Sequence, residues 1–114
     1  MINVQAVVLK QLLTSEDTLE LNKAFLRLKK QYFSNAFSSI YIAIQTYYAE
    51  HGSIPKLETL QLLYNRNVKL SQALSVLELQ KVPEVSIDHS ISVLENEVAQ
   101  DYALDLIEDN ILKD

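Results

Sequence analysis

The residues that most often carry out chemistry are sparse in this chain, and their spacing matches no common active site. A phosphate-binding P-loop needs several glycines before its Lys and Ser or Thr, whereas Gly52 is the only glycine among 114 residues. The absence of cysteine excludes thiol catalysis and thiolate metal sites. His51 and His89 lie 38 positions apart without a companion at ligand spacing, so we expect structural roles and no zinc site. No serine has a histidine placed by a local catalytic signature, so we expect no active site.

Two groups of side chains could instead bind nucleic acid. Lys23, Arg27 and Lys30 recur at helical spacing and could contact phosphates, although such a stripe is more often a solvated helix face. The net charge of −5 argues against autonomous DNA binding, which leaves the stripe as a candidate partner surface. Four tyrosines could stack on bases, but their helical spacing beside Ile and Leu favours packing in the core. These tyrosines are Tyr41, Tyr47, Tyr48 and Tyr64.

The composition predicts what kind of fold positions these residues. Apolar residues make up 48% of the chain and charged residues 22%, as is typical of one globular domain. One glycine and two prolines offer few turns, which favours a few long helices over many short strands. The N-terminal segment lacks the basic region and cleavage site of a signal peptide, and no apolar run reaches the length of a membrane span. We therefore expect an all-α, cytoplasmic protein.

The stretch from Tyr32 to Leu63 is predicted to contain the central helix of the fold. Asn35 is suited to the N-cap, because its side chain can accept a hydrogen bond from the first turn. Gly52 is suited to the left-handed residue that ends such a helix, and Pro55 favours the start of the next one. Two further helices are predicted before this stretch, the second of them capped by Thr14 or Ser15. The apolar face of the central helix comprises Phe37, Ile40, Tyr41, Ile44 and Tyr48.

The last third of the chain is predicted to form two antiparallel helical arms. Pro83 ends the first arm, and Ser86 or Asp88 can cap the second. The second arm is about twice as long as the first, so part of its apolar stripe has no partner within the hairpin, and we expect self-association. The predicted fold is thus a compact orthogonal helical bundle over residues 1–66 followed by an antiparallel helical hairpin over residues 67–114, within one domain.

The acidic residues gather in the same third of the chain. From Glu84 onward there are nine acidic residues and one basic residue, Lys113. Acids near the C-terminus of a helix oppose its dipole, and like charges four residues apart repel. One interpretation is that the natural helix or a linker continues beyond Asp114 and that this chain is a fragment. The other is a solvated acidic face that aids solubility.

The order of these elements resembles the N-terminal domain of DnaB-type hexameric replicative DNA helicases, from about Val4 to Leu112. This sequence departs from the pattern at Lys56, where the family often has a short acidic or hydroxyl cap, and in the Arg27–Lys30 region, which is more basic than usual. The start of the last helix looks closer to tailed-phage versions of the domain. The pattern is carried by Tyr32-Phe33, Phe37, Ile40, Ile44, Tyr48, Gly52, Ile54-Pro55, Leu57-Glu58-Thr59-Leu60 and Asp88-His89-Ser90.

The resemblance implies a non-catalytic part of a replication machine in a bacterium or phage-infected host. ATP and Mg²⁺ would act in the parent helicase and not here. The domain would pair through its hairpin, as a homodimer or ring-forming homo-oligomer, and would offer a surface to primase or a helicase loader. Leu94→Asp or Val98→Asp is then expected to give monomers that keep their helices. The expected self-association residues are Leu70, Ala73, Leu74, Leu77, Ile91, Leu94, Val98 and Tyr102.

Two alternatives stay open on the sequence. The helicase-binding domain of primases is also a small helical domain that ends in a hairpin, although Met1 at the start of the pattern argues against it. The other alternative is a standalone phage adaptor or regulator, which a natural stop after Asp114 would favour. An enzyme is a more distant third.

Overall fold

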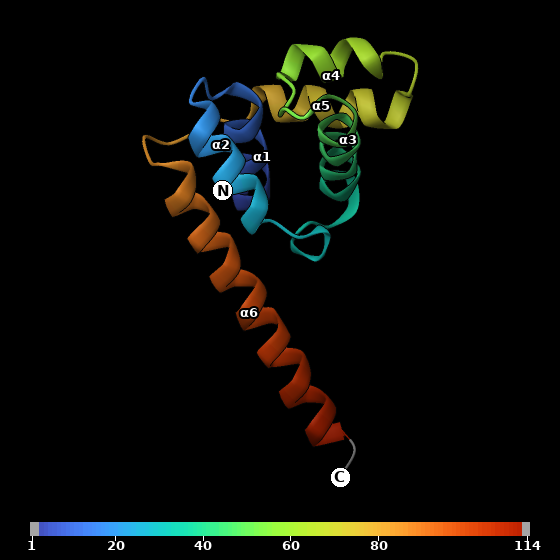
Figure 1. The fold of residues 1–114 in the computed structure, drawn as a ribbon. Coiled ribbons are helices and arrows are strands. Elements are labelled where there is room, and N and C mark those ends of the chain that lie inside the picture. The colour runs from blue at the N-terminus through green and yellow to red at the C-terminus, as the bar shows by residue number, and fades with distance from the viewer. Residues whose placement is uncertain (1–2, 113–114) are drawn as a thin grey trace.

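The computed structural model describes the backbone of residues 3–112 and the side chains of residues 3–100. Over that range the chain forms only helices, as predicted, and it measures 52 × 30 × 29 Å. Figure 1 shows the first five α-helices gathered into a globule and the last helix running out from it. In chain order the helices are α1 (Val4–Thr14), α2 (Thr18–Arg27), the 3-10 helix η1 (Lys30–Tyr32), α3 (Asn35–His51), α4 (Leu57–Leu63), α5 (Val68–Leu79) and α6 (Ile87–Leu112).

Helix α1, and not the predicted α3, occupies the centre of the fold. Asn3 caps α1, because its side-chain oxygen accepts a hydrogen bond from the Ala6 N–H at 3.2 Å. All five of the other α-helices pack against α1. A helix that is apolar on every side is stable only when it is surrounded by protein. Its buried residues are Ala6, Val7, Val8, Leu9, Gln11, Leu12 and Leu13.

Helix α2 begins later than predicted and returns the chain towards α3. Asp17 is its N-cap and accepts from the Glu20 N–H at 3.1 Å, a role that the sequence interpretation gave to Thr14 or Ser15. The difference arises because α1 itself continues to Thr14. After α2 the buried side chains of Leu28 and Phe33 hold the connection around η1 against the core.

Helix α3 ends as predicted but does not begin as predicted. Gly52 has a left-handed φ of 72°, and its N–H donates to the Tyr48 carbonyl at 2.7 Å, which closes the last turn. Asn35, the predicted N-cap, is instead the first helical residue and has a φ of 54°. Asparagine adopts this region more readily than most residues. Ser34 is at the N-cap position, without a side-chain hydrogen bond to the helix.

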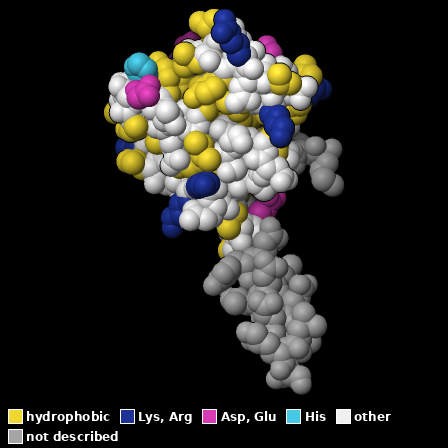
Figure 2. Space-filling view, turned by 90° about the vertical axis from the view of Figure 1, so that its right-hand side faces the viewer, with side chains coloured by type: hydrophobic (Ala, Val, Ile, Leu, Met, Phe, Trp, Pro, Cys, Tyr) yellow, Lys and Arg dark blue, Asp and Glu magenta, His cyan; other side chains and the backbone are white. Residues whose placement is uncertain are grey.

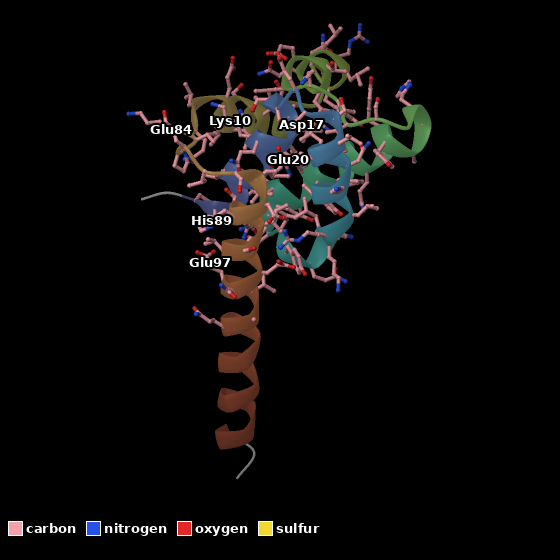
Figure 3. All side chains as sticks on the ribbon, turned by 60° about the vertical axis from the view of Figure 1, so that its left-hand side comes forward. Lys10, Asp17, Glu20, Glu84, His89 and Glu97 are labelled. Carbon is pink, nitrogen blue, oxygen red and sulfur yellow. The ribbon has the colours of Figure 1, made fainter. Side chains whose placement is uncertain are left out.

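Helices α4 and α5 form the end of the globule farthest from the tip of α6 (Figure 1). Asn67 caps α5 by accepting from the Leu70 N–H at 3.1 Å. The C-terminus of α5 has no basic residue of its own in its last turn. Lys10 of α1, labelled in Figure 3, supplies a positive charge there instead. Its ammonium donates to the carbonyls of Glu78 at 2.6 Å and Gln80 at 2.7 Å.

Helix α6 packs chiefly on α1, so the predicted antiparallel hairpin with α5 does not form. Its N-cap is as predicted, because Ser86 Oγ accepts from the His89 N–H at 3.1 Å. The apolar side of α5 packs on α3, α4 and α1, whereas α6 packs on α1, α2 and η1. Residues from both predicted parts, 1–66 and 67–114, share one hydrophobic core.

The tyrosines of α3 take part in this core, as their spacing predicted. Tyr41 is only 2% exposed and stacks on Phe33 with ring centres 4.9 Å apart. Tyr48 lies 5.0 Å from the ring of Phe25, and Tyr64 packs at the edge of the core. Tyr47 is half-buried against His51. The interpretation of these rings as packing groups is therefore confirmed for Tyr41, Tyr48 and Tyr64.

Candidate interaction site

The predicted self-association stripe is mostly inside the molecule. Six of its eight side chains are buried in the chain's own core, so packing within the molecule accounts for most of the stripe. Val98 is half-buried at the edge of the core, and the side chain of Tyr102 lies outside the described residues. The six buried residues are Leu70, Ala73, Leu74, Leu77, Ile91 and Leu94.

This burial overturns the expected result for Leu94→Asp. The Leu94 side chain is 1% exposed, so a carboxylate there would be taken out of water without a partner. The variant is therefore expected to lose the fold rather than to give folded monomers. Beyond Leu94 the helix leaves the globule, so a contact through its apolar stripe with another molecule falls on that part of α6 (Figure 1).

The residues of the predicted basic stripe, Lys23, Arg27 and Lys30, have different surroundings in the structure. Arg27 pairs with Asp88 and, at 2.5 Å, with Glu95, and it also donates to Ser92 Oγ at 3.3 Å. Its hydrogen bond with Glu95 and the two nearby carboxylates raise the pKa of the guanidinium, despite an opposing effect of burial. Arg27 therefore fastens α2 to α6 and is not a free partner contact.

The side chains of Lys23 and Lys30 are exposed, so both remain candidate contacts for a partner. Lys23 lines a shallow depression between α2 and the start of α6, together with three carboxylates. Two of these carboxylates are labelled in Figure 3, namely Asp17, the N-cap of α2, and Glu20 in the helix itself. The depression therefore has mixed charge, which makes it unlike a phosphate-binding surface. The third carboxylate is Asp88.

The histidines occupy separate surface positions. The ring of His51 lies 4.3 Å from that of Tyr47, and its Nε2 is 3.9 Å from a Glu50 carboxylate oxygen. His89 is exposed in the first turn of α6 and appears there in Figure 3. Within the described part of the chain, no group of three or more His, Cys, Asp or Glu side chains is arranged to hold a metal ion.

An open groove of about 800 Å³ lies between α3 and α5. Most of its surface is apolar, and Lys69 is its only charged side chain. Ala43, Leu70 and Ala73 are buried at its base, while Ile42 is 41% and Val76 is 62% exposed. The groove is completed by Asn35, Ala36, Ser39, Tyr64, Asn67 and Gln72.

Sequence reasoning missed this groove, although a signal for it was present. Ala36, Ser39 and Ala43 follow one another at three- and four-residue spacing, so small side chains lie along one face of α3. Ala73 faces the same space from α5. Small residues on two neighbouring helices leave room that larger ones would fill. Ile42 of α3 forms part of the exposed wall.

Charge is distributed unevenly between the globule and the end of the chain. Up to Asn96 the chain has nine basic and nine acidic residues, whereas from Glu97 onward it has six acidic residues and one lysine. Figure 3 shows Glu97 on the side of α6 that faces away from the globule. The globule is therefore neutral overall, and the net charge of −5 belongs to the last segment.

Comparisons with protein-family models, with curated proteins and with solved structures find no match. Among the described helices, none combines the length and the apolar character that a membrane crossing needs.

Proposed function

We propose that this chain is a non-catalytic self-association domain, namely the N-terminal collar domain of a DnaB-type hexameric replicative helicase. Its task is to hold copies of the protein together and to present a docking surface to primase or a helicase loader. ATP and Mg²⁺ act at the motor of the helicase and not on this domain. The observation that carries the proposal is the single long helix α6, which leaves the globule and continues without a partner helix beside it (Figure 1).

Energetics support an association role for α6. A helix that is isolated in water is only marginally stable, and most helical stability in proteins comes from packing of an apolar face. The sequence of α6 beyond the globule carries such a pattern, with Val98, Tyr102 and Leu106 at four-residue spacing and Ile107 and Ile111 alongside. Burial of each large apolar side chain contributes about 1.5–3 kcal/mol. Contact with a second copy would therefore stabilise both helices.

The proposal differs from the sequence-based one in the residues it uses. The buried residues of α5 and of the first two turns of α6 hold the globule together, so the part of α6 that contacts another copy falls on the segment from Val98 onward. The candidate surface for primase or loader is reduced to Lys23 and Lys30, because Arg27 pairs with α6.

Sedimentation equilibrium tests the association, because a monomer has a mass of only 13.0 kDa. The wild-type chain is expected to show a mass that rises with concentration, and Leu106→Asp is expected to lower that mass to the monomer value. Gln100→Asp is the matched control, since it adds the same charge at an exposed position of the same helix. A wild-type chain that stays at 13.0 kDa at all concentrations would refute the proposal.

Calorimetric titration separates the helicase assignment from the primase alternative. A helicase collar domain is expected to bind purified primase or loader from the same source. A helicase-binding domain of a primase would instead bind the helicase and show no heat with primase.

A further inference from the structure

We propose that the groove between α3 and α5 is the receptor for α6 of a second copy, which inserts the segment 98–112. This inference rests on the proposed self-association and specifies its geometry. Copies would join head to tail, with the projecting helix of one molecule in the groove of the next.

The form of the groove suits a helix. It is bordered along its length by two helices, α3 and α5, and it is open to solvent on its outer side. Its volume is about 800 Å³, and its surface is mainly apolar. An amphipathic helix that lays its apolar face into such a groove is a common mode of protein recognition.

The exposed apolar side chains extend beyond the groove itself. Val68 at the start of α5 is 67% exposed, and Leu62 and Leu63 of α4 are 73% and 56% exposed. Figure 2 shows hydrophobic side chains gathered over this end of the globule. Extensive exposed apolar surface on a soluble domain is characteristic of an interaction site.

The α6 segment has the complementary chemistry. It is helical to Leu112, and 15 residues of helix are about 22 Å long. Its sequence alternates apolar residues with acids, of which Glu97, Asp101 and Asp105 recur every four residues. Such a helix could place an apolar row in the groove and keep its acids at the rim.

Charge complementarity points to the same pairing. The only charge that lines the groove is the cation of Lys69, whereas the segment from Glu97 onward has six acids and one lysine. Figure 2 shows Lys and Arg side chains distributed among the apolar patches of this face, with acidic side chains towards its edges. Attraction between the two surfaces would guide docking and would weaken as salt is added.

The occupant has to come from another molecule. Helix α6 starts on the side of the globule formed by α1 and α2, and Figure 1 shows it running away from α3 and α5. Its own segment 98–112 therefore lies far from its own groove. Because the two contacting surfaces are different, each copy keeps a free groove and a free helix, and the contact generates rings or longer chains rather than only dimers.

The test uses one variant on each side of the contact. Val76→Glu places a carboxylate in the wall of the groove at an exposed position, and Lys69→Glu is a second groove variant that reverses its only charge. Leu79→Glu is the matched control, because it makes a similar change on the same helix outside the groove lining. Circular dichroism verifies that each variant keeps its helical content.

Val76→Glu and Lys69→Glu are each expected to weaken self-association at least about tenfold, and Leu79→Glu less than about twofold, as measured by sedimentation equilibrium. Mixing distinguishes head-to-tail docking from other contacts. Val76→Glu retains a competent α6, and Leu106→Asp retains a competent groove. The two variants, each monomeric alone, are expected to form a complex of two 13.0-kDa chains when mixed.

Three results would overturn the inference. Groove variants that associate like the wild type would show that α6 docks elsewhere, while the proposed function would stand. Variants that are monomeric alone and also when mixed would indicate a symmetric contact in which each copy uses both surfaces. A wild-type chain that never associates would remove the proposed function together with the inference.

Discussion

At the scale of single residues, Tyr41 stabilises the fold through packing and hydrogen bonding, and the contribution of its hydroxyl depends on pH. Its buried hydroxyl donates to the Leu28 carbonyl at 3.0 Å and accepts from the Gln45 amide at 3.3 Å. Burial raises the pKa of this hydroxyl above its ordinary value of 10.0, and the bond from Gln45 lowers it in part. Tyr41→Phe leaves the Leu28 carbonyl without this donor, so we expect the free energy of unfolding at pH 7 to fall by about 1–3 kcal/mol.

The raised pKa of Tyr41 also determines how the stability difference between the wild type and Tyr41→Phe depends on pH. The unfolded chain releases the Tyr41 proton more readily than the folded chain, so the hydroxyl's contribution is complete below pH 10 and decreases as pH rises above it. The wild type and Tyr41→Phe should therefore approach each other in stability in alkaline urea titrations. Tyr47→Phe is the control, with an expected change within about 0.5 kcal/mol. A gap that widens above pH 10 would contradict the assignment.

Gly52 carries the second prediction at this scale. Its φ of 72° is costly for residues with a Cβ, although a Cβ here would meet no atom within 4 Å. Gly52→Ala should therefore lower the free energy of unfolding by about 1–2 kcal/mol through backbone strain alone. Gly52→Asn should cost less, because asparagine tolerates the left-handed region. Equal losses for the two variants in thermal unfolding would mean that strain is not the cause.

Local signals of this kind were readable from the sequence. The stop at Gly52 and the cap at Ser86 depend on one residue and its nearest turn, and both were predicted. The start of α3 was not predicted correctly. Asn35 can either cap a helix or adopt a positive φ, and the sequence does not distinguish these roles.

At the scale of helices, Arg27 fastens α2 to the first three turns of α6. Arg27→Ala removes two ion pairs whose members are partly exposed, so we expect a loss of about 0.5–2 kcal/mol in low salt and a smaller loss in 1 M NaCl. Amide hydrogen exchange in α6 should increase at the same time. Lys23→Ala on the same helix is the control and should change neither quantity. A loss that is independent of salt would argue against ion pairing.

Substitution of Leu94 tests whether the face of α6 that carries it belongs to the core. Its side chain is 1% exposed, so Leu94→Ala should lower the free energy of unfolding by about 2–5 kcal/mol through lost burial and a residual cavity. Val93→Ala, at a half-buried position one residue earlier, should cost clearly less. Chemical denaturation measures both values. Equal stability of Leu94→Ala and the wild type would restore the earlier interpretation of Leu94 as an interface residue.

The error in the predicted hairpin arose at this scale. Periodicity identified the apolar face of α5, and that of α6 as far as Leu94, but it does not say which helix covers each face. Helix α1, which is buried from Ala6 to Leu9, fills the position between the two predicted arms. The groove was missed for the same reason, since it exists only through the pairing of α3 with α5.

At the scale of the whole molecule, the chain has two different ends. One end has an apolar groove that contains Lys69 as its only charge, and the other is an acidic helix beyond the globule. Such polarity favours head-to-tail assembly, whereas a symmetric pair would bring two acidic helices together. A directional contact of this kind can close into a ring, which is why the groove and α6 are central to the proposed function.

Paramagnetic relaxation between copies tests this contact most directly, and the absence of native cysteine makes the labelling simple. The Asn110→Cys chain, made without isotope label, carries a nitroxide on its cysteine. It is mixed with wild-type chain labelled with ¹⁵N. Head-to-tail docking predicts broadened amide signals for groove residues such as Ser39 and Gln72, and unchanged signals for Leu9 of the central helix. Broadening confined to α6, or no broadening at concentrations where the mass exceeds 13.0 kDa, would contradict it.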